Sequence, residues 1–193
     1  MEFMTDQYAM VSMSQDRPAR ILGNLRADMN AKAIWYLGTT NRGCALRMLM
    51  SDGSFCTVLY RLMIALRRHH LGPLAAIVCK LNASMTGAII GYEAEFGPGL
   101  IILHSLGLVI NKAVRGGVNV VLEGAVTLGA EKGISPVLGD HVFVGTGAKV
   151  LGGVRVGNRV RIGANAVVVR DVPDDATAVG VPARVVRVRG EAP

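Results

Sequence analysis

A six-residue period runs through the second half of the chain, from Tyr92 to Pro173. When this stretch is written in blocks of six, the fifth position is always small or aliphatic, apart from one aromatic residue at the start. The fifth positions are Phe96, Ile102, Leu108, Val114, Val120, Val126, Val142, Ala148, Val154, Val160, Ala166 and Val172. Such a repeat is typical of a parallel β-helix, in which each block is a strand, three blocks make a coil and stacked coils bury one apolar column. The period therefore predicts a parallel β-helix.

The composition agrees with a narrow solenoid. Aromatic residues make up only 5% of the 193 residues, and the 24 glycines can turn corners at low steric cost. The formal charge of +7 is compatible with nucleic acid, an anionic membrane surface or an anionic small ligand. Because the basic residues are scattered and have no stacking aromatics between them, nucleic acid is not expected. An anionic cofactor or a membrane surface fits better.

The cysteines and the N-terminus indicate where the protein works. Cys44, Cys56 and Cys79 have neither paired spacing nor an even count, which indicates a reducing compartment. Asp6 and Asp16 interrupt any apolar run at the start, so we expect no secretory signal and a cytoplasmic location, including the inner face of the membrane. Segment 71–91 has the length of a membrane span but contains several polar residues, so a buried or interfacial helix is the favoured interpretation.

The first half of the chain lacks the six-residue period and is predicted to be helical. Apolar residues recur at helical spacing over 17–37, with Asp16 as N-cap, and over 54–70, with Ser54 as cap. A third helix is expected over about 73–87. The sequence therefore divides into a helical region 1–90, a β-helix 91–185 and a basic tail 186–193.

The period breaks once, between Gly129 and Val137, where one block follows the previous one after ten residues instead of six. An insertion in a solenoid usually leaves the coil as a loop and often serves the binding face. We therefore predict an extruded loop over 129–137.

Few residues of the predicted β-helix could act as acid or base. Of the four histidines only His104 and His141 lie on it, and His141 is expected to be a surface residue. His104 takes the first position of its block, where later blocks mostly carry an aliphatic residue. Histidine can accept a proton from a hydroxyl as its oxygen attacks an acyl donor, so acyl transfer is the favoured chemistry, with a structural histidine as the alternative. Two histidines do not make a three-histidine zinc site, so no metal is expected.

Several stretches resemble the hexapeptide-repeat acetyltransferases, in the branch around serine acetyltransferase and the colanic acid or capsular polysaccharide O-acetyltransferases. They are GPGLIILHSLGLVINKAV, GAVTLGAEKG, LGDHVFVGTGAKVLGGVRVGNRVRIGANAVVVRDVP and AVGVPARVV, about half of the chain. The resemblance implies a left-handed β-helix that forms homotrimers, sometimes paired into hexamers, and that transfers acetyl from acetyl-CoA to a hydroxyl without a metal.

The same resemblance implies roles for individual residues. His104 falls on the family's catalytic histidine, which deprotonates the acceptor. The acetyl-CoA groove, which lies between adjacent subunits in this family, matches Gly145, Thr146, Gly163, Ala164, Arg170 and Arg184. The glycines would admit the pantetheine arm close to the backbone, and the arginines would offset phosphate charge.

Two departures from the serine acetyltransferase pattern affect the expected acceptor. Leu103 stands where those enzymes have an aspartate before the histidine, and Ser135 stands where they have a second histidine. The resemblance thus implies that Leu103 and Ser135 lie at the substrate-binding positions for the acceptor. Losing these groups would leave the charges of serine without their usual partners. We therefore expect a sugar or polysaccharide precursor as acceptor, with direct transfer in a ternary complex and backbone N–H groups stabilising the oxyanion.

Two alternatives remain open at this stage. One is serine O-acetylation in cysteine biosynthesis, and the other is an inactive β-helix that serves as a scaffold. The apolar helical half is expected either to associate peripherally with a membrane or to be buried between subunits of a hexamer.

Overall fold

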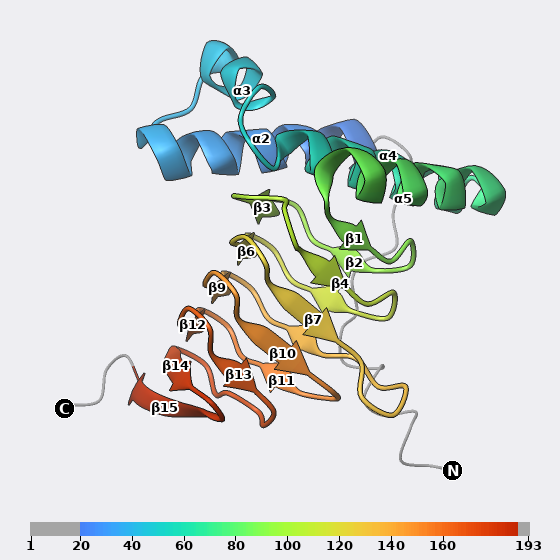
Figure 1. Ribbon diagram of the computed structural model, residues 1–193. Helices are drawn as coiled ribbons and strands as arrows, with labels where there is room; N and C mark the ends of the chain where they lie inside the picture. Colours follow the sequence, from blue (N-terminus) through green and yellow to red (C-terminus); the bar gives the residue numbers. More distant parts are fainter. Residues whose placement is uncertain (1–19, 189–193) are drawn as a thin grey trace.

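A computed structural model describes residues 20–188, which form a stack of parallel coils with a layer of helices across one end (Figure 1). The helices are α2 (Arg20–Leu37), α3 (Arg42–Met48), α4 (Ser54–Arg68) and α5 (Gly72–Thr86). They lie over the end of the stack where the first strands begin, and the C-terminal strands close the opposite end.

Three sheets of short strands form the faces of the described β-helix, and each strand pairs in parallel with the equivalent strand of the next coil. The five-stranded sheet contains β1 (Ile89–Ile90), β4 (Val109–Ile110), β7 (Thr127–Gly129), β10 (Lys149–Leu151) and β13 (Val167–Val168). The four-stranded sheet contains β2 (Glu95–Phe96), β5 (Arg115–Gly116), β8 (Val137–Leu138) and β11 (Arg155–Val156). The six-stranded sheet contains β3 (Ile101–Ile102), β6 (Val121–Leu122), β9 (Phe143–Val144), β12 (Arg161–Ile162), β14 (Ala176–Gly180) and β15 (Ala183–Val188), the last one antiparallel to β14.

The apolar column lies where the period predicts it. Every fifth position from Phe96 to Val172 is buried, with 5% exposure or less. A second inward position lies two residues further on in most strands, as at Leu122, Val144 and Ile162. Each short strand thus directs two side chains into the core, and the parallel β-helix prediction is confirmed.

One coil is longer than the period suggests. Ile89 pairs with Val109, 20 residues later, whereas Val109 pairs with Thr127, 18 residues later. The two extra residues lie in the turn between Ile102 and Leu108, the turn that contains His104. The expectation that His104 occupies the first position of a regular block is therefore wrong. The two-residue insertion is not visible in the sequence pattern, because a shift of two residues exchanges one inward-facing position of the strand for the other.

The predicted loop leaves the coil between β7 and β8, on the lower right in Figure 1. Residues 130–136 form this connection, and a bridge between Glu131 and Ile134 closes a tight turn. Lys132 and Gly133 adopt positive φ in that turn. The insertion thus extends one corner without disturbing the strands on either side, because β5 and β8 still pair in register.

A buried ion pair joins the helices to the first coil. Arg61 on α4 makes two hydrogen bonds to the carboxylate of Asp28 on α2, of 2.7 and 2.9 Å. The same guanidinium donates to the carbonyl oxygens of Phe96 and Gly97, and Asp28 accepts from the backbone N–H groups of Gly99 and Leu100. Since both charges are almost fully buried, this network requires both partners, and the helices are docked on the solenoid in one orientation.

The helix predictions hold in outline. Helices α2, α4 and α5 fall within the predicted stretches, whereas α3 was not predicted. Gly53, not Ser54, is the N-cap of α4, and the predicted cap Asp16 lies outside the described residues. Within residues 20–188, no helix combines the length and the apolar character needed to cross a membrane.

Candidate functional site

His104 lies at the enlarged turn of the first coil, where the chain passes from the six-stranded to the five-stranded sheet. Its side chain is 59% exposed, so the imidazole is accessible from solvent. In the next coil the equivalent residue is Gly124, and a Cβ built there would lie 3.2 Å from the Cβ of His104. The two extra residues and the glycine below give the ring free space on the outside of the coil.

Asp52 contacts the ring of His104 from the helical half of the protein. Its Oδ2 lies 2.8 Å from Nδ1 of His104, and the hydrogen bond from His104 lowers the pKa of the Asp52 carboxyl below its usual value. An ionised carboxylate accepts, so Nδ1 carries the proton and Nε2 is left with its lone pair. The pair therefore has the arrangement of a general base held by a carboxylate.

The loop that carries Asp52 is held by unusual local packing. Gly53 has a φ of +73°, and a Cβ there would lie 2.2 Å from the carbonyl oxygen of Ile102. Only glycine combines this backbone conformation with this close approach. Lys32 on α2 is buried beside it and donates to the carbonyl oxygens of Asp52 and Ile102 and to Oγ of Ser54.

Two further polar groups lie near the pair. Burial raises the pKa of the Tyr36 phenol, and the negative charges of Asp52 and Glu123 raise it further. Glu123 occupies the position below Leu103, because Ile102 pairs with Leu122. Within residues 20–188 the Glu123 carboxylate makes no hydrogen bond or salt bridge. Asp52 and Glu123 thus supply two carboxylates in this region.

Four of the predicted acetyl-CoA residues continue the corner that contains His104. The strand register aligns Ile102, Leu122, Val144 and Ile162. Two residues after each strand, His104 is therefore followed down the stack by Gly124, Thr146 and Ala164. Gly145 and Gly163 stand one residue before Thr146 and Ala164, and a Cβ on either would meet a neighbour within 3 Å. We call His104, Gly124, Thr146 and Ala164 the corner column.

The two predicted arginines lie at different places. Arg184 is exposed on β15, opposite Val179, which lies below Gly163, so it stands at the far end of the corner column. Arg170 is exposed just after β13, at the corner from which the extruded loop leaves the solenoid. Within a single subunit, Arg184 therefore lies at the same corner as His104, and Arg170 lies at a different corner.

The two positions proposed for acceptor binding are occupied by structural side chains. Leu103 is 5% exposed and packs with Ile101 and Val121, with Ala31 of α2 against them. Ser135 is 4% exposed, and its hydroxyl donates to Oδ1 of Asn111 over 3.0 Å, at the loop corner. Neither side chain faces the open side of His104. His141 is exposed in a turn, as predicted.

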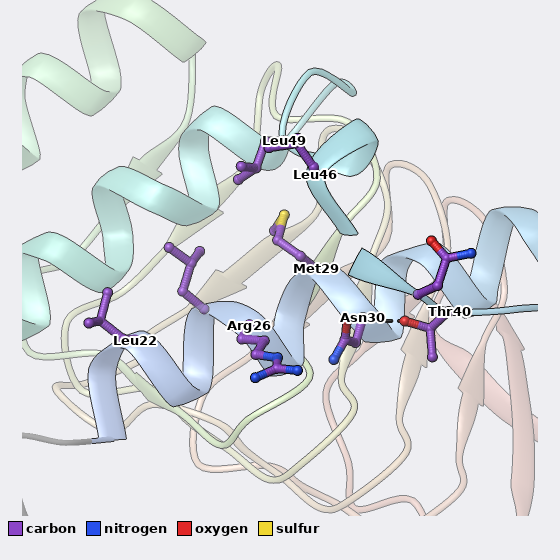
Figure 2. A pocket seen from close by; sticks show the side chains of 9 residues that line it. Leu22, Arg26, Met29, Asn30, Thr40, Leu46 and Leu49 are labelled. Atoms are coloured by element: carbon purple, nitrogen blue, oxygen red, sulfur yellow. Dashed lines mark hydrogen bonds between the residues drawn. The ribbon is translucent and has the colours of Figure 1, made fainter. Parts of the chain in front are cut away.

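A separate cavity of about 640 Å³ lies between α2 and α3 (Figure 2), and neither His104 nor Asp52 is among the residues that line it. Its lining is mostly apolar, with the side chains Leu22, Leu25, Met29, Leu46 and Leu49. Arg26 is its one charged lining residue among those described, so the cavity offers no acid–base pair. The chemistry of the described residues is concentrated at His104.

Asp52, Lys32 and Glu123 were not identified from the sequence. Asp52 precedes His104 by 52 positions, and no local pattern connects them. Only one signal was available for this segment, the Asp-Gly dipeptide before a strongly amphipathic helix, which marks a tight turn. For Glu123, the six-residue alignment would have placed it beside Leu103 only if the two extra residues had been recognised.

Known proteins resemble the chain over most of its length. The family model for the bacterial transferase hexapeptide (six repeats) matches residues 135–170. A serine acetyltransferase of Helicobacter pylori is 41% identical over 143 residues, which cover 72% of this chain and 84% of that protein.

Solved structures agree with this relationship. The structure of serine acetyltransferase from Brucella abortus superposes with a TM-score of 0.80 at 28% identity, covering 90% of this chain and 71% of that one. A serine acetyltransferase solved in complex with CoA gives a TM-score of 0.80 at 29% identity, over 88% and 71% of the two chains.

These relatives correct the prediction for the acceptor. They are named serine acetyltransferases, so the prediction of a sugar or polysaccharide acceptor is wrong, and the alternative interpretation is the better supported one. Leu103 and Ser135 are both buried in this structure, so these two departures do not by themselves identify the acceptor. The relationship also identifies an acetyltransferase, not an inactive scaffold. The chain belongs to the serine acetyltransferase family of hexapeptide-repeat transferases.

Proposed function

We propose that this protein transfers the acetyl group of acetyl-CoA to the hydroxyl of L-serine, the step that commits serine to cysteine biosynthesis. The observation that carries the proposal is 41% identity to a serine acetyltransferase over 84% of that protein's length. The chemistry available at His104 agrees with it, because acyl transfer to a hydroxyl needs a general base and no metal.

The pair of His104 and Asp52 supplies the proton transfer. Nε2 of His104 accepts the serine hydroxyl proton while the oxygen attacks the thioester carbon. The tetrahedral intermediate then expels the CoA sulfur, which takes the proton back from His104. Asp52 holds the ring in the required tautomer and stabilises the imidazolium between these two steps. No covalent acyl-enzyme is needed, since the three cysteines lie in the helical half.

The donor is expected to lie along the corner column. Gly124, Thr146 and Ala164 are small, so a long, thin arm can approach the backbone over several coils. The column runs from His104 to Arg184, a span of roughly 24 Å at about 4.8 Å per strand spacing. Arg184 at its far end can offset phosphate charge. In this proposal the reactive end of acetyl-CoA lies at His104.

The proposal includes a trimer. Hexapeptide β-helix acetyltransferases are typically trimers, and a groove between adjacent subunits would have walls from two chains. Arg170 lies at a different corner from the corner column, so it could contact the same donor only from a neighbouring subunit. The position of Arg170 therefore supports a groove shared between subunits.

Glu123 is the residue we propose for recognition of the acceptor's ammonium group. It lies one coil below Leu103, close enough to Tyr36 to raise its pKa, and its carboxylate is unpaired within the described chain. A carboxylate beside the general base can hold the ammonium group of serine while the hydroxyl faces His104.

The proposal is tested by an acceptor assay. Purified protein is incubated with acetyl-CoA and L-serine as sole acceptor, and release of the CoA thiol is followed. We expect saturable turnover in the wild type and a loss of roughly two to four powers of ten in kcat for His104→Ala. Turnover with serine no faster than acetyl-CoA hydrolysis without acceptor would show that the substrate is wrong. Near-normal turnover by His104→Ala would refute the mechanism.

A further inference from the structure

Lys32 is a buried cation next to the proposed active site. Its side chain is 1% exposed, although lysine is almost never fully buried unless its charge is paired. Within residues 20–188 it forms no salt bridge. Instead, its ammonium group donates to three oxygens: the carbonyl of Asp52, Oγ of Ser54 at 3.0 Å and the carbonyl of Ile102 at 2.9 Å. Three N–H donors thus meet three acceptors.

The acceptors belong to the two segments that carry the catalytic pair. One is the main chain of Asp52 itself, and another is the side chain two residues later, at the start of α4. The third is the last residue of β3, two positions before His104. Lys32 therefore connects the loop of Asp52 to the strand that leads to His104, from a third element, α2.

We propose that Lys32 is a positioning residue for acetyl transfer, which fixes Asp52 at hydrogen-bonding distance from Nδ1 of His104. The inference rests on the proposed role of His104 as general base. Lys32 contacts neither substrate nor the imidazole; it acts through Asp52. Two contacts fix the loop of Asp52 against strand β3. One is the close packing of Gly53 on Ile102, and the other is the set of hydrogen bonds from the ammonium group of Lys32.

The charge state of Lys32 makes this role visible in a pH profile. Burial lowers the pKa of Lys32 to about 8, against the opposing effects of Asp52 and of the Cys56 thiol. Among residues 20–188, the ionisable groups that act on it are Asp52 from the loop and Cys56 from α4, and β3 contributes a main-chain oxygen. A neutral amine has two N–H groups for three acceptors, so one contact is lost above this pH. The pair of Asp52 and His104 should then loosen.

The test is a double-mutant cycle on the full-length enzyme. Lys32→Met, Asp52→Asn and the double variant are compared with the wild type in kcat and in KM for acetyl-CoA. We expect Lys32→Met to lower kcat by about tenfold to a hundredfold, the scale of a 1 Å misplacement, with KM for acetyl-CoA within about twofold. The double variant should be no slower than Asp52→Asn alone, because Lys32 acts through Asp52.

Tyr60→Phe is the matched control. The hydroxyl of Tyr60 is fully buried and makes two hydrogen bonds from α4 to the first coil, to the carbonyl of Ala94 and from the N–H of Phe96. It does not touch the segments of Asp52 or His104. Its removal should lower the urea midpoint of unfolding while leaving kcat within about twofold of the wild type. The control therefore shows whether weaker docking of the helices lowers kcat without loss of the Lys32 contacts.

The outcomes distinguish this inference from the proposed function. If His104→Ala abolishes turnover while Lys32→Met and Asp52→Asn lower kcat by factors that multiply, the inference about Lys32 is wrong and the function stands. An unchanged kcat in Lys32→Met also overturns it. If His104→Ala stays active, the proposed mechanism fails first.

The wild type provides a test that needs no variant to fold. At saturating serine and acetyl-CoA, kcat should decline as the pH rises through about 8, where Lys32 loses its proton. A kcat that stays level from about pH 7 to about pH 9.5, across the Lys32 pKa of about 8, would contradict the inference.

Discussion

His104, Asp52 and Lys32 form a series of contacts that runs from the surface of the first coil into the protein. His104 and Asp52 are more than half exposed, and Lys32 is buried behind them. His104 can exchange a proton with substrate, whereas Lys32 is fixed by three acceptors. An exposed pair is by itself weakly held in water. The buried lysine is what gives this pair a defined geometry.

Stability and activity should respond to alkaline pH in opposite directions at Lys32. The folded-state pKa of about 8 lies below the ordinary lysine value of 10.5, so between these values the unfolded chain binds more protons than the folded one. The contribution of Lys32 to the free energy of unfolding therefore rises with pH over that window and is constant below it. Urea titrations of wild type and Lys32→Met should show that the free energy of unfolding of the wild type increases relative to that of the variant as the pH rises from about 8 to 10.5. A difference that is independent of pH would contradict this.

Glu123→Gln should weaken binding of serine with little effect on the donor. Loss of one charged hydrogen bond costs about 1.5–3 kcal/mol, so KM for serine should rise by roughly tenfold to a hundredfold. The control is Glu131→Gln, which removes an exposed carboxylate in the extruded loop at another corner. Initial rates over a range of serine concentrations provide the measurement. Equal KM values for serine in wild type and Glu123→Gln would remove Glu123 from the acceptor site.

Helix α4 depends on the glycine that precedes it. Gly53 has positive φ and no room for a Cβ, since Ile102 would lie within 2.2 Å. Gly53→Ala should therefore destabilise the protein and displace Asp52, with a loss of kcat. Gly38→Ala is the control: its φ is +66°, but nothing lies within 4 Å of the new Cβ. We expect about 1–2 kcal/mol of backbone strain at Gly38 without loss of kcat, and a larger destabilisation at Gly53. Equal destabilisation in urea titrations would show that the contact with Ile102 is unimportant.

The elements that could be predicted are those with a repeating pattern. The fifth positions of the blocks follow a period over 80 residues, so each inward side chain is supported by its neighbours above and below. Helix α3 has only seven residues, too few for two turns of a periodic stripe. The enlarged turn at His104 stayed hidden for a related reason, because a two-residue insertion keeps the alternation of inward and outward side chains. Irregularities, which place the functional residues, are the least visible part of a periodic sequence.

Most of the candidate site residues that could be predicted lie on the repeat. His104, Thr146 and Ala164 share one corner of successive coils, so a sequence motif can describe them. Asp52 and Lys32 reach the site through docking of α2 and α4 on the first coil. That docking is fixed by the ion pair of Asp28 and Arg61, whose partners lie 33 positions apart. Contacts between elements so far apart have no local pattern.

The whole molecule has an apolar surface on its helical layer. Helix α5 exposes side chains three or four residues apart along one face, namely Leu74, Ile77, Leu81 and Met85, each 47–63% exposed. Exposed apolar patches of this kind mark interaction surfaces in soluble proteins. The sequence led to the same expectation of burial between subunits, and it remains a prediction.

Charge on this face should change the assembly. We expect sedimentation of the wild type to give a mass that is a multiple of three chains of 20.4 kDa. Leu74→Glu combined with Leu81→Glu should lower that mass, because burying two carboxylates in an apolar contact is unfavourable. Lys80→Glu, on the same helix, is the control and should leave it unchanged. The same mass in all three proteins would show that α5 is not at a subunit contact.

Both ends of the solenoid are closed, by the helical layer at β1 to β3 and by the antiparallel strand β15 at the other end. The number of coils between His104 and Arg184 is therefore fixed, and the length of the corner column is a whole number of strand spacings. A donor longer or shorter by one bond cannot be matched by a small adjustment of this backbone, because length changes only in increments of about 4.8 Å. With acetyl-CoA along the corner column as proposed, the solenoid would select donors by the distance from phosphate to acyl carbon as well as by their chemistry.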